Sequence, residues 1–167
     1  MEQYILEKSI WTQDDFAVMG WHDANIYGMV IEKGEEPWQG NLIFDIDYIF
    51  EWVHPVPPQK YFSFWVAPCT LIFKEVYELR IDIDQQGNTL ELFDFHNISL
   101  LTKEELNNGA IIYEWLLELH VGEIQFKSLG FEQMVRKTPI CTNGQVLSLE
   151  ERGGVSFSKQ AFEKSNK

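Results

Sequence analysis

Acidic side chains at regular spacing are the first feature of this sequence that could do chemistry. Asp45 and Asp47 lie two positions apart, and Glu51 follows them in the stretch that ends at Trp52. In a strand, residues two apart point to the same face, so these carboxylates would share one surface. Such a surface could bind a metal ion or a cationic partner. It could also be the ordinary solvent face of an antiparallel sheet, which is the commoner case.

Histidine beside aspartate forms a second candidate site. The four histidines of the chain are His22, His54, His96 and His120. His22 precedes Asp23, and this pair could supply a metal ligand or a general base next to a carboxylate. Because both lie at predicted strand ends, His22 and His54 could meet in space and form a metal site together with Asp23. The alternative is that the pair forms a turn beside a buried Trp21.

Motifs for other kinds of chemistry are absent from the sequence. There is no GxSxG, GxGxxG or GxxxxGK[ST] sequence, so a serine nucleophile elbow and the common phosphate loops are excluded. The two cysteines, Cys69 and Cys141, do not form a CxxC pair, and apolar neighbours predict a buried, unreactive thiol at Cys69. We therefore expect no cofactor, and a role without catalysis is favoured.

The acidic stretch is itself a strong strand pattern. Its alternate positions are all apolar or aromatic, namely Leu42, Phe44, Ile46, Tyr48, Phe50 and Trp52. Period-two alternation over this length predicts a strand with one face in the core. The prolines at positions 55, 57 and 58 end the strand, because proline cannot donate a hydrogen bond to a neighbouring strand.

Similar patterns predict strands along most of the chain. They cover 25–32, 61–67, 70–76, 78–84, 89–95, 111–120, 124–128 and 131–137. Turn residues join 78–84 to 89–95 and 111–120 to 124–128 as hairpins, and Pro68 is expected to break the strand at 61–67. Capping boxes predict short helices after Thr12 and within 101–108. The expected fold is mainly β, with α+β also open: an antiparallel sandwich or curled sheet of about eight strands with one or two short helices.

Length and charge set further limits. The 167 residues suit one domain over 1–167, with a mobile polar tail after about 154. The net charge of −13 opposes binding to nucleic acids and anionic membranes, which need cationic contacts. Neither a signal peptide nor a membrane-spanning stretch is evident, so we expect a cytoplasmic protein.

Several motifs resemble an uncharacterised bacterial family of small cytoplasmic domains. They are Trp21-His22-Asp23, 45–49 with Trp52, 64–71, 122–126 and 130–133 with Arg136. The resemblance spans roughly 21–152 and carries no assigned activity. Small acidic bacterial domains of this kind include immunity proteins that neutralise secreted toxins, an analogy of general appearance.

These observations predict a protein-binding domain without enzymatic activity, whose partner is basic and could be a toxin. The expected binding residues are Asp45, Asp47, Glu51, Trp52 and Trp38. Aromatic side chains beside an acidic rim suit a protein interface. The alternative is a metal-dependent hydrolase that uses His22, Asp23 and nearby carboxylates, with His54 as a further candidate ligand. A homo-oligomer built on the aromatic strand is a third hypothesis.

Overall fold

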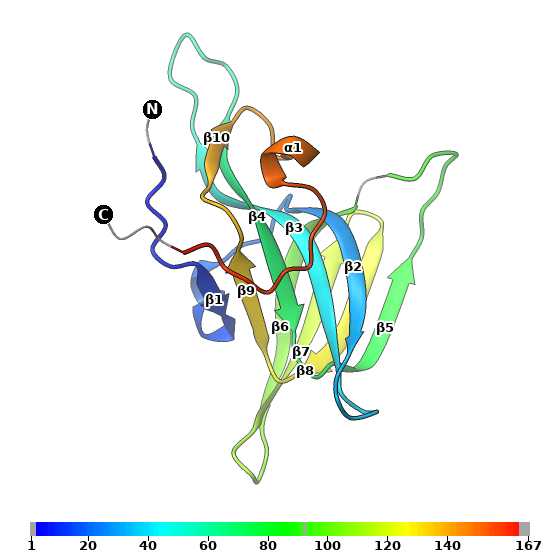
Figure 1. Cartoon of the computed structure of the whole chain (residues 1–167). Helices are drawn as coiled ribbons and strands as arrows, with labels where there is room; N and C mark the ends of the chain where they lie inside the picture. Colours follow the sequence, from blue (N-terminus) through cyan, green and yellow to red (C-terminus); the bar gives the residue numbers. More distant parts are fainter. Residues whose placement is uncertain (1–2, 92, 164–167) are drawn as a thin grey trace.

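A curled antiparallel sheet makes up most of the protein (Figure 1). The computed structural model describes residues 3–91 and 93–163. The ten strands found there are β1 (Ile10–Thr12), β2 (Asn25–Lys33), β3 (Gly40–Val53), β4 (Ser63–Phe73), β5 (Tyr77–Ile83), β6 (Phe93–Glu105), β7 (Ile111–Leu119), β8 (Gly122–Ser128), β9 (Phe131–Val135) and β10 (Ile140–Thr142). Two short helices accompany them, the 3-10 helix η1 (Gln13–Val18) and α1 (Leu149–Arg152). The expected curled, mainly β fold is confirmed.

The strand order is β1-β9-β4-β3-β2-β6-β7-β8-β5, and β10 pairs with β4. The sheet thus has two halves that meet where β2 pairs with β6. Among the described residues two directly opposite pairs form that junction, Asn25 with Asp94 and Ile26 with Phe93. In the second half, β6, β7 and β8 pass behind β4, β3 and β2, and β5 lies to the right of β2, so that the two halves face each other (Figure 1).

Aromatic side chains from both halves fill the space between them. Phe73 of β4 lies at the centre, with ring contacts to Phe44, Trp115, Phe126 and Phe131 at centroid distances of 4.8–6.3 Å. Most of these pairs are edge-to-face, the arrangement that aromatic quadrupoles favour. This core accounts for the high aromatic content and confirms that Leu42, Phe44, Ile46 and Tyr48 of β3 point inward.

A bulge reverses the alternation near the end of β3. The register with β4 shifts between Ile49 and Glu51, which leaves Phe50 as an extra residue. Because an inserted residue moves the following side chains to the opposite face, Trp52 packs on Phe64 with ring centroids 5.0 Å apart. The prediction that Trp52 belongs to the core face is therefore wrong, and 38% of this residue is exposed.

Proline does not interrupt β4 as expected. The strand runs through Pro68 and pairs with β3 along its whole length. On its other side, β9 pairs with 69–73 and β10 pairs with 64–66. On that side, Pro68 therefore lies in the gap between the residues paired with β10 and those paired with β9. Its missing N–H costs no hydrogen bond between strands there.

Two further local predictions are wrong because tertiary pairing overrides local preference. The segment 101–108, expected as a helix, mostly continues β6 and pairs with β7, Lys103 lying opposite Tyr113. The segments 78–84 and 89–95, expected as one hairpin, separate: β5 pairs with β8, and β6 pairs with β2 and β7. Residue 92 of that hairpin lies outside the described residues. The hairpin of β7 and β8 is confirmed.

The segment after β10 crosses the outer face of β3 and β4 (Figure 1). Phe157 and Ala161 pack on an apolar group formed by Ile43, Ile72 and Met134. The hydroxyl of Thr70 donates to the Ser158 carbonyl at 2.7 Å. Both faces of β3 are consequently covered. Mobility of the tail after 154 stays a prediction, and 164–167 lie outside the described residues.

Helices long and apolar enough to cross a membrane are not found among the described residues. The capping box predicted at Thr12 is present, with Asp15 accepting from the Thr12 backbone N–H, and it starts η1 as expected.

The two cysteines differ in exposure, which predicts their reactivity. Burial raises the pKa of the Cys69 thiol, whereas Cys141 is exposed. Because the thiolate is the reactive form, we expect a thiol reagent such as Ellman's reagent to modify one cysteine in the native protein and two after denaturation. Cys141→Ser should abolish the native reaction. A fast-reacting thiol that survives this substitution would contradict the placement of Cys69.

Candidate functional site

The carboxylates of Asp45 and Asp47 are fully buried. Both lie on the outer face of β3, and the exposure of each residue is 0%. The prediction that they form a solvent-exposed acidic surface is wrong, because α1 and the segment that follows it cover this face. A strand pattern cannot reveal a cover that comes from residues about a hundred positions away.

Two arginines neutralise the buried carboxylates. Arg152, the last residue of α1, donates from Nη1 to Asp45 Oδ2 at 2.8 Å and from Nη2 to Asp45 Oδ1 at 2.7 Å. Its Nε donates to Asp47 Oδ1 at 3.2 Å. Arg136, just after β9, donates from Nη2 to Asp45 Oδ1 at 2.6 Å. Two acids and two bases thus meet with zero net charge, in the forked geometry that makes arginine–carboxylate pairs strong.

Backbone groups and an aromatic ring complete this buried network. The N–H of Ser156 donates to Asp45 Oδ2, and that of Leu147 donates to Asp47 Oδ2, both at 2.8 Å. The guanidinium of Arg152 lies 3.5 Å from the ring centroid of Tyr27, a cation–π contact. All four carboxylate oxygens therefore accept a hydrogen bond, as buried charges require.

The environment moves the pKa values of the two acids in opposite directions. Burial would raise the pKa of Asp45, but hydrogen bonds from Arg152, Arg136 and Ser156 outweigh it and hold that pKa below its ordinary value. Burial raises the pKa of Asp47, because the Leu147 N–H and Arg152 compensate only in part. Burial and the Asp47 charge also raise the pKa of Tyr27 to about 12. The network thus holds Asp45 as the ionised partner of the arginines.

The other predicted binding residues are exposed but do not form one patch. Trp38 lies in the turn between β2 and β3 and is 76% exposed, whereas Glu51 and Trp52 lie at the far end of β3. A strand of this length spans roughly 40 Å, so the two tryptophans are well separated. Binding by Glu51, Trp52 and Trp38 stays a prediction.

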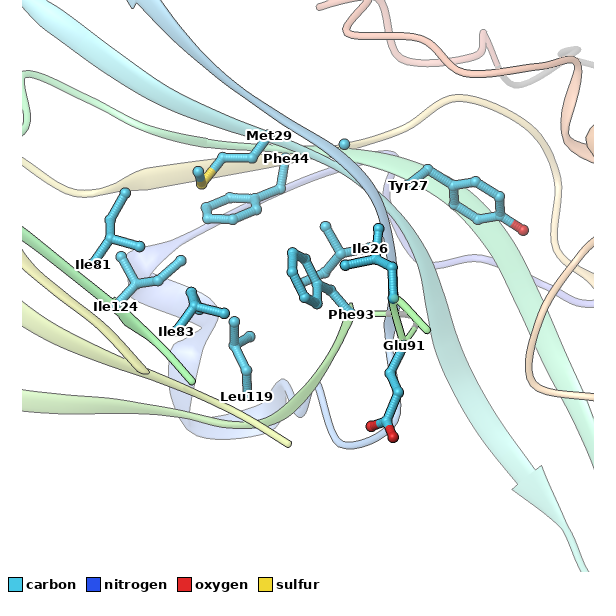
Figure 2. A pocket seen from close by; sticks show the side chains of 12 residues that line it. Ile26, Tyr27, Met29, Phe44, Ile81, Ile83, Glu91, Phe93, Leu119 and Ile124 are labelled. Atoms are coloured by element: carbon cyan, nitrogen blue, oxygen red, sulfur yellow. The ribbon is translucent and has the colours of Figure 1, made fainter. Parts of the chain in front are cut away.

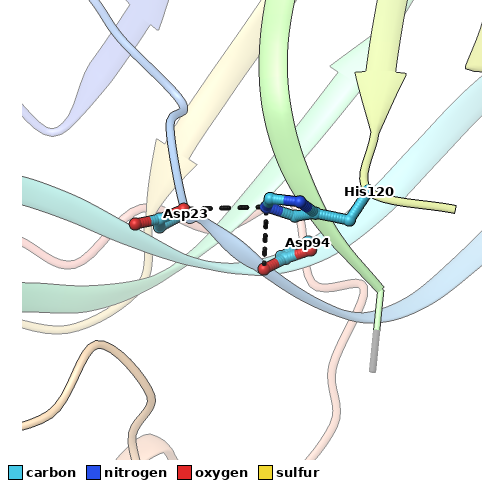
Figure 3. Close-up of side chains that lie close together, drawn as sticks. All are labelled: Asp23, Asp94 and His120. Carbon is cyan, nitrogen blue, oxygen red and sulfur yellow. Dashed lines mark ion pairs between the residues drawn. The ribbon is translucent and has the colours of Figure 1, made fainter. Parts of the chain in front are cut away.

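An aspartate–histidine group forms where the two halves of the sheet join (Figure 3). His120 Nε2 lies 3.8 Å from Asp23 Oδ1 and 3.6 Å from Asp94 Oδ2. One ligand atom from each of the three residues lies within 4.8 Å of the others, a spacing that could hold a metal ion. Asp23 was predicted, whereas Asp94 and His120 were not named as ligands.

Strand pairing places each member of this group. Asp94 lies in β6 opposite Asn25, the first residue of β2, and His120 follows β7 in the turn to β8. Asp23 adopts a left-handed backbone conformation, φ 62°, which aspartate tolerates better than most residues. Its N–H donates to the Phe95 carbonyl at 2.9 Å, which fixes the loop against β6.

Two of the remaining histidines, His22 and His96, contact this group or each other, and His54 does not. The His96 ring contacts both His22 and His120, with centroids 5.4 Å apart in each case. His22 also stacks on Trp52 at 6.1 Å. His54 instead packs against Phe62 and is not part of the aspartate–histidine group. The structure thus brings His22 and Asp23 together with two histidines that the sequence did not single out.

A shallow acidic depression lies next to these histidines, with a volume of about 360 Å³. Its acidic side chains are Asp82, Asp84, Glu118 and Glu123, and His96 lines it too. Glu123 of β8 lies directly opposite both Glu118 of β7 and Asp82 of β5. Like charges in such positions repel. In the described part of the chain only Asp82 has a cationic partner, Arg80.

A second cavity is apolar and lies between the two halves of the sheet (Figure 2). Its volume is about 360 Å³, and Met29 and Phe44 line it from one half, Ile81 and Ile124 from the other. Tyr27 and Glu91 carry the polar side-chain atoms of its lining, and both point away from the apolar side chains in Figure 2. Ligand sites need convergent polar groups to orient a ligand, and the described side chains of this lining supply none.

Comparison with known proteins adds no family. No protein-family model matches the sequence, and neither a curated protein nor a solved structure matches it significantly.

Replacement of a buried arginine should lower the stability of the protein far more than replacement of an exposed one. Arg152→Met leaves two buried carboxylates with only Arg136, so we expect the free energy of unfolding to fall by about 3–5 kcal/mol. Arg80→Met removes an exposed pair with Asp82 and should change it by less than about 1 kcal/mol. Urea unfolding at pH 7 measures both. Equal, small effects would show that the buried network is unimportant for stability.

Proposed function

We propose that the protein binds a basic protein partner through the acidic depression, and that it acts in the cytoplasm without catalysis. Neutralisation of a basic toxin is the specific role that this chemistry fits. The observation that supports the proposal most is the row of carboxylates across β5, β8 and β7, Asp82, Glu123 and Glu118, in which directly opposite strand positions carry like charges.

Such a row costs stability in the free protein, because carboxylates that lie opposite each other repel. A cationic side chain placed between them removes that repulsion, so binding relieves a strain present in the unbound state. The remainder of the surface shares the excess of acid, with a net charge of −13 for the chain. Charge of one sign speeds association with a partner of the opposite sign.

The proposed surface differs from the one expected from the sequence. Asp45 and Asp47 face Arg136 and Arg152 within the chain, so their charge is already balanced. The four carboxylates of the depression have one arginine near them, Arg80, which pairs with Asp82 at 3.1 Å. Carboxylates without a cationic partner in the described part of the chain therefore lie in the depression, on β7, β8 and just after β5.

Charge removal at the depression tests the proposal against charge removal elsewhere. The test variant carries Asp82→Asn, Asp84→Asn, Glu118→Gln and Glu123→Gln. The control carries Glu35→Gln, Glu36→Gln, Glu104→Gln and Glu105→Gln, four exposed acids outside the depression, so that both variants have the same net charge. With the basic partner captured from the native cell at low salt, we expect the test variant to bind about 10–100-fold more weakly, because each exposed pair contributes up to about 1 kcal/mol.

The control should bind within about threefold of the unaltered protein, because rim charges elsewhere act only through screened long-range attraction. Surface plasmon resonance measures both affinities and their salt dependence. Equal weakening of test and control variants would mean that net charge alone matters. Full affinity in the test variant would place the partner on another surface.

A further inference from the structure

We propose that Asp23, Asp94 and His120 form a binding site for one divalent transition-metal ion, with Zn²⁺ as the representative ion. The site lies at the junction of β2 and β6, where two residue pairs join the halves of the sheet. It lies beside the acidic depression but shares no residue with its lining, and neither proposal depends on the other.

The distances between the ligand atoms are the first argument. His120 Nε2 is 3.6 Å from Asp94 Oδ2 and 3.8 Å from Asp23 Oδ1 (Figure 3). These separations exceed a hydrogen bond, which joins such atoms at about 2.7–3.2 Å. In a tetrahedral zinc site with bonds of about 2.0–2.2 Å, neighbouring ligand atoms lie about 3.3–3.6 Å apart. All three ligand atoms lie within 4.8 Å of one another, so a small inward shift of the side chains brings them to this spacing around an ion.

The hydrogen bond made by Asp23 is the second argument. Gln145 Nε2 donates to Asp23 Oδ2 at 2.8 Å, which leaves Oδ1 directed toward His120. Metal-binding carboxylates and imidazoles are usually oriented by such a neighbouring group. Gln145 lies in the segment between β10 and α1, so its amide connects that segment to Asp23.

His22 lies at the edge of this site. Its Nδ1 lies 3.1 Å from the His96 carbonyl, which can only accept, so Nδ1 donates in that hydrogen bond. Its Nε2 lies 3.6 Å from Asp23 Oδ1. The His96 carbonyl thus holds the His22 ring next to one of the proposed ligands.

The ligand types and their exposure select the class of ion. One imidazole with two carboxylates suits Zn²⁺ and other first-row transition metals, whereas Mg²⁺ and Ca²⁺ prefer oxygen ligands throughout. The side chains of Asp23, Asp94 and His120 are 22%, 31% and 49% exposed, so an ion can enter from solvent. An ion bound there would connect the loop before β2, β6 and the β7–β8 turn.

Zinc titration of the full chain tests this site. Calorimetry is done in a Cys141→Ser background, because the exposed Cys141 thiol could bind zinc elsewhere. We expect saturation at one Zn²⁺ per chain and a weakening of at least about 10-fold in Asp94→Asn and in His120→Ala. Gln145→Ala should weaken binding about 10-fold as well. His54→Ala, a histidine outside the group, should leave the affinity unchanged.

Thermal unfolding gives a second measurement that does not rely on calorimetric heat. Zinc at about 100 times its dissociation constant should raise the melting temperature by about 5–10 °C, and Mg²⁺ should not. The rise should be absent in His120→Ala, which alters an exposed turn residue and therefore still folds even where Asp94→Asn does not. Absence of saturable binding, or equal affinity in the His120→Ala and unaltered proteins, would overturn the proposal. The proposal would also be overturned if the variants were less stable than the unaltered protein and zinc bound to none of them, including the unaltered protein. The three residues would then form an ion pair and no metal site.

Discussion

The interaction on which the rest of the structure depends is the buried pairing of Arg152 with Asp45 and Asp47. It holds α1 and the following segment against the outer face of β3, with all the charges inside the protein. Removal of either partner would leave an uncompensated charge in a place that water does not reach. Phe157 and Ala161 add apolar contacts to the same cover, because they pack on Ile43, Ile72 and Met134.

The same constraint separates the acidic residues into two kinds. Asp45 and Asp47 are balanced within the chain, whereas the carboxylates of the acidic depression and of the aspartate–histidine group are not fully balanced. Unbalanced carboxylates are the ones that gain from an external cation, either a basic side chain or a metal ion. The two proposals above follow from that difference. A hydrolytic reaction would first require the metal, and it stays a prediction.

The sequence predicted most strands, because alternation is a local property of the chain. It could not predict the cover over Asp45, since Arg152 lies 107 positions away and no local pattern marks its partner. It also failed at 101–108, where helix-favouring residues are held in β6 by pairing with β7. Of the candidate site, His22 and Asp23 were visible as neighbours. Asp94 and His120 join them only through the pairing of β2, β6 and β7.

The most direct test asks which carboxylates bind a cation. Crystals of the Cys141→Ser variant, which lacks the exposed thiol, would be soaked in zinc and measured with X-rays at the zinc absorption edge. We expect one anomalous peak about 2.0–2.2 Å from Asp23 Oδ1, Asp94 Oδ2 and His120 Nε2, and no peak beside Asp45 and Asp47. A peak beside Asp45 and Asp47, or no peak at the aspartate–histidine group, would contradict the account. It would show that balanced carboxylates bind a cation, or that the unbalanced ones of this group do not.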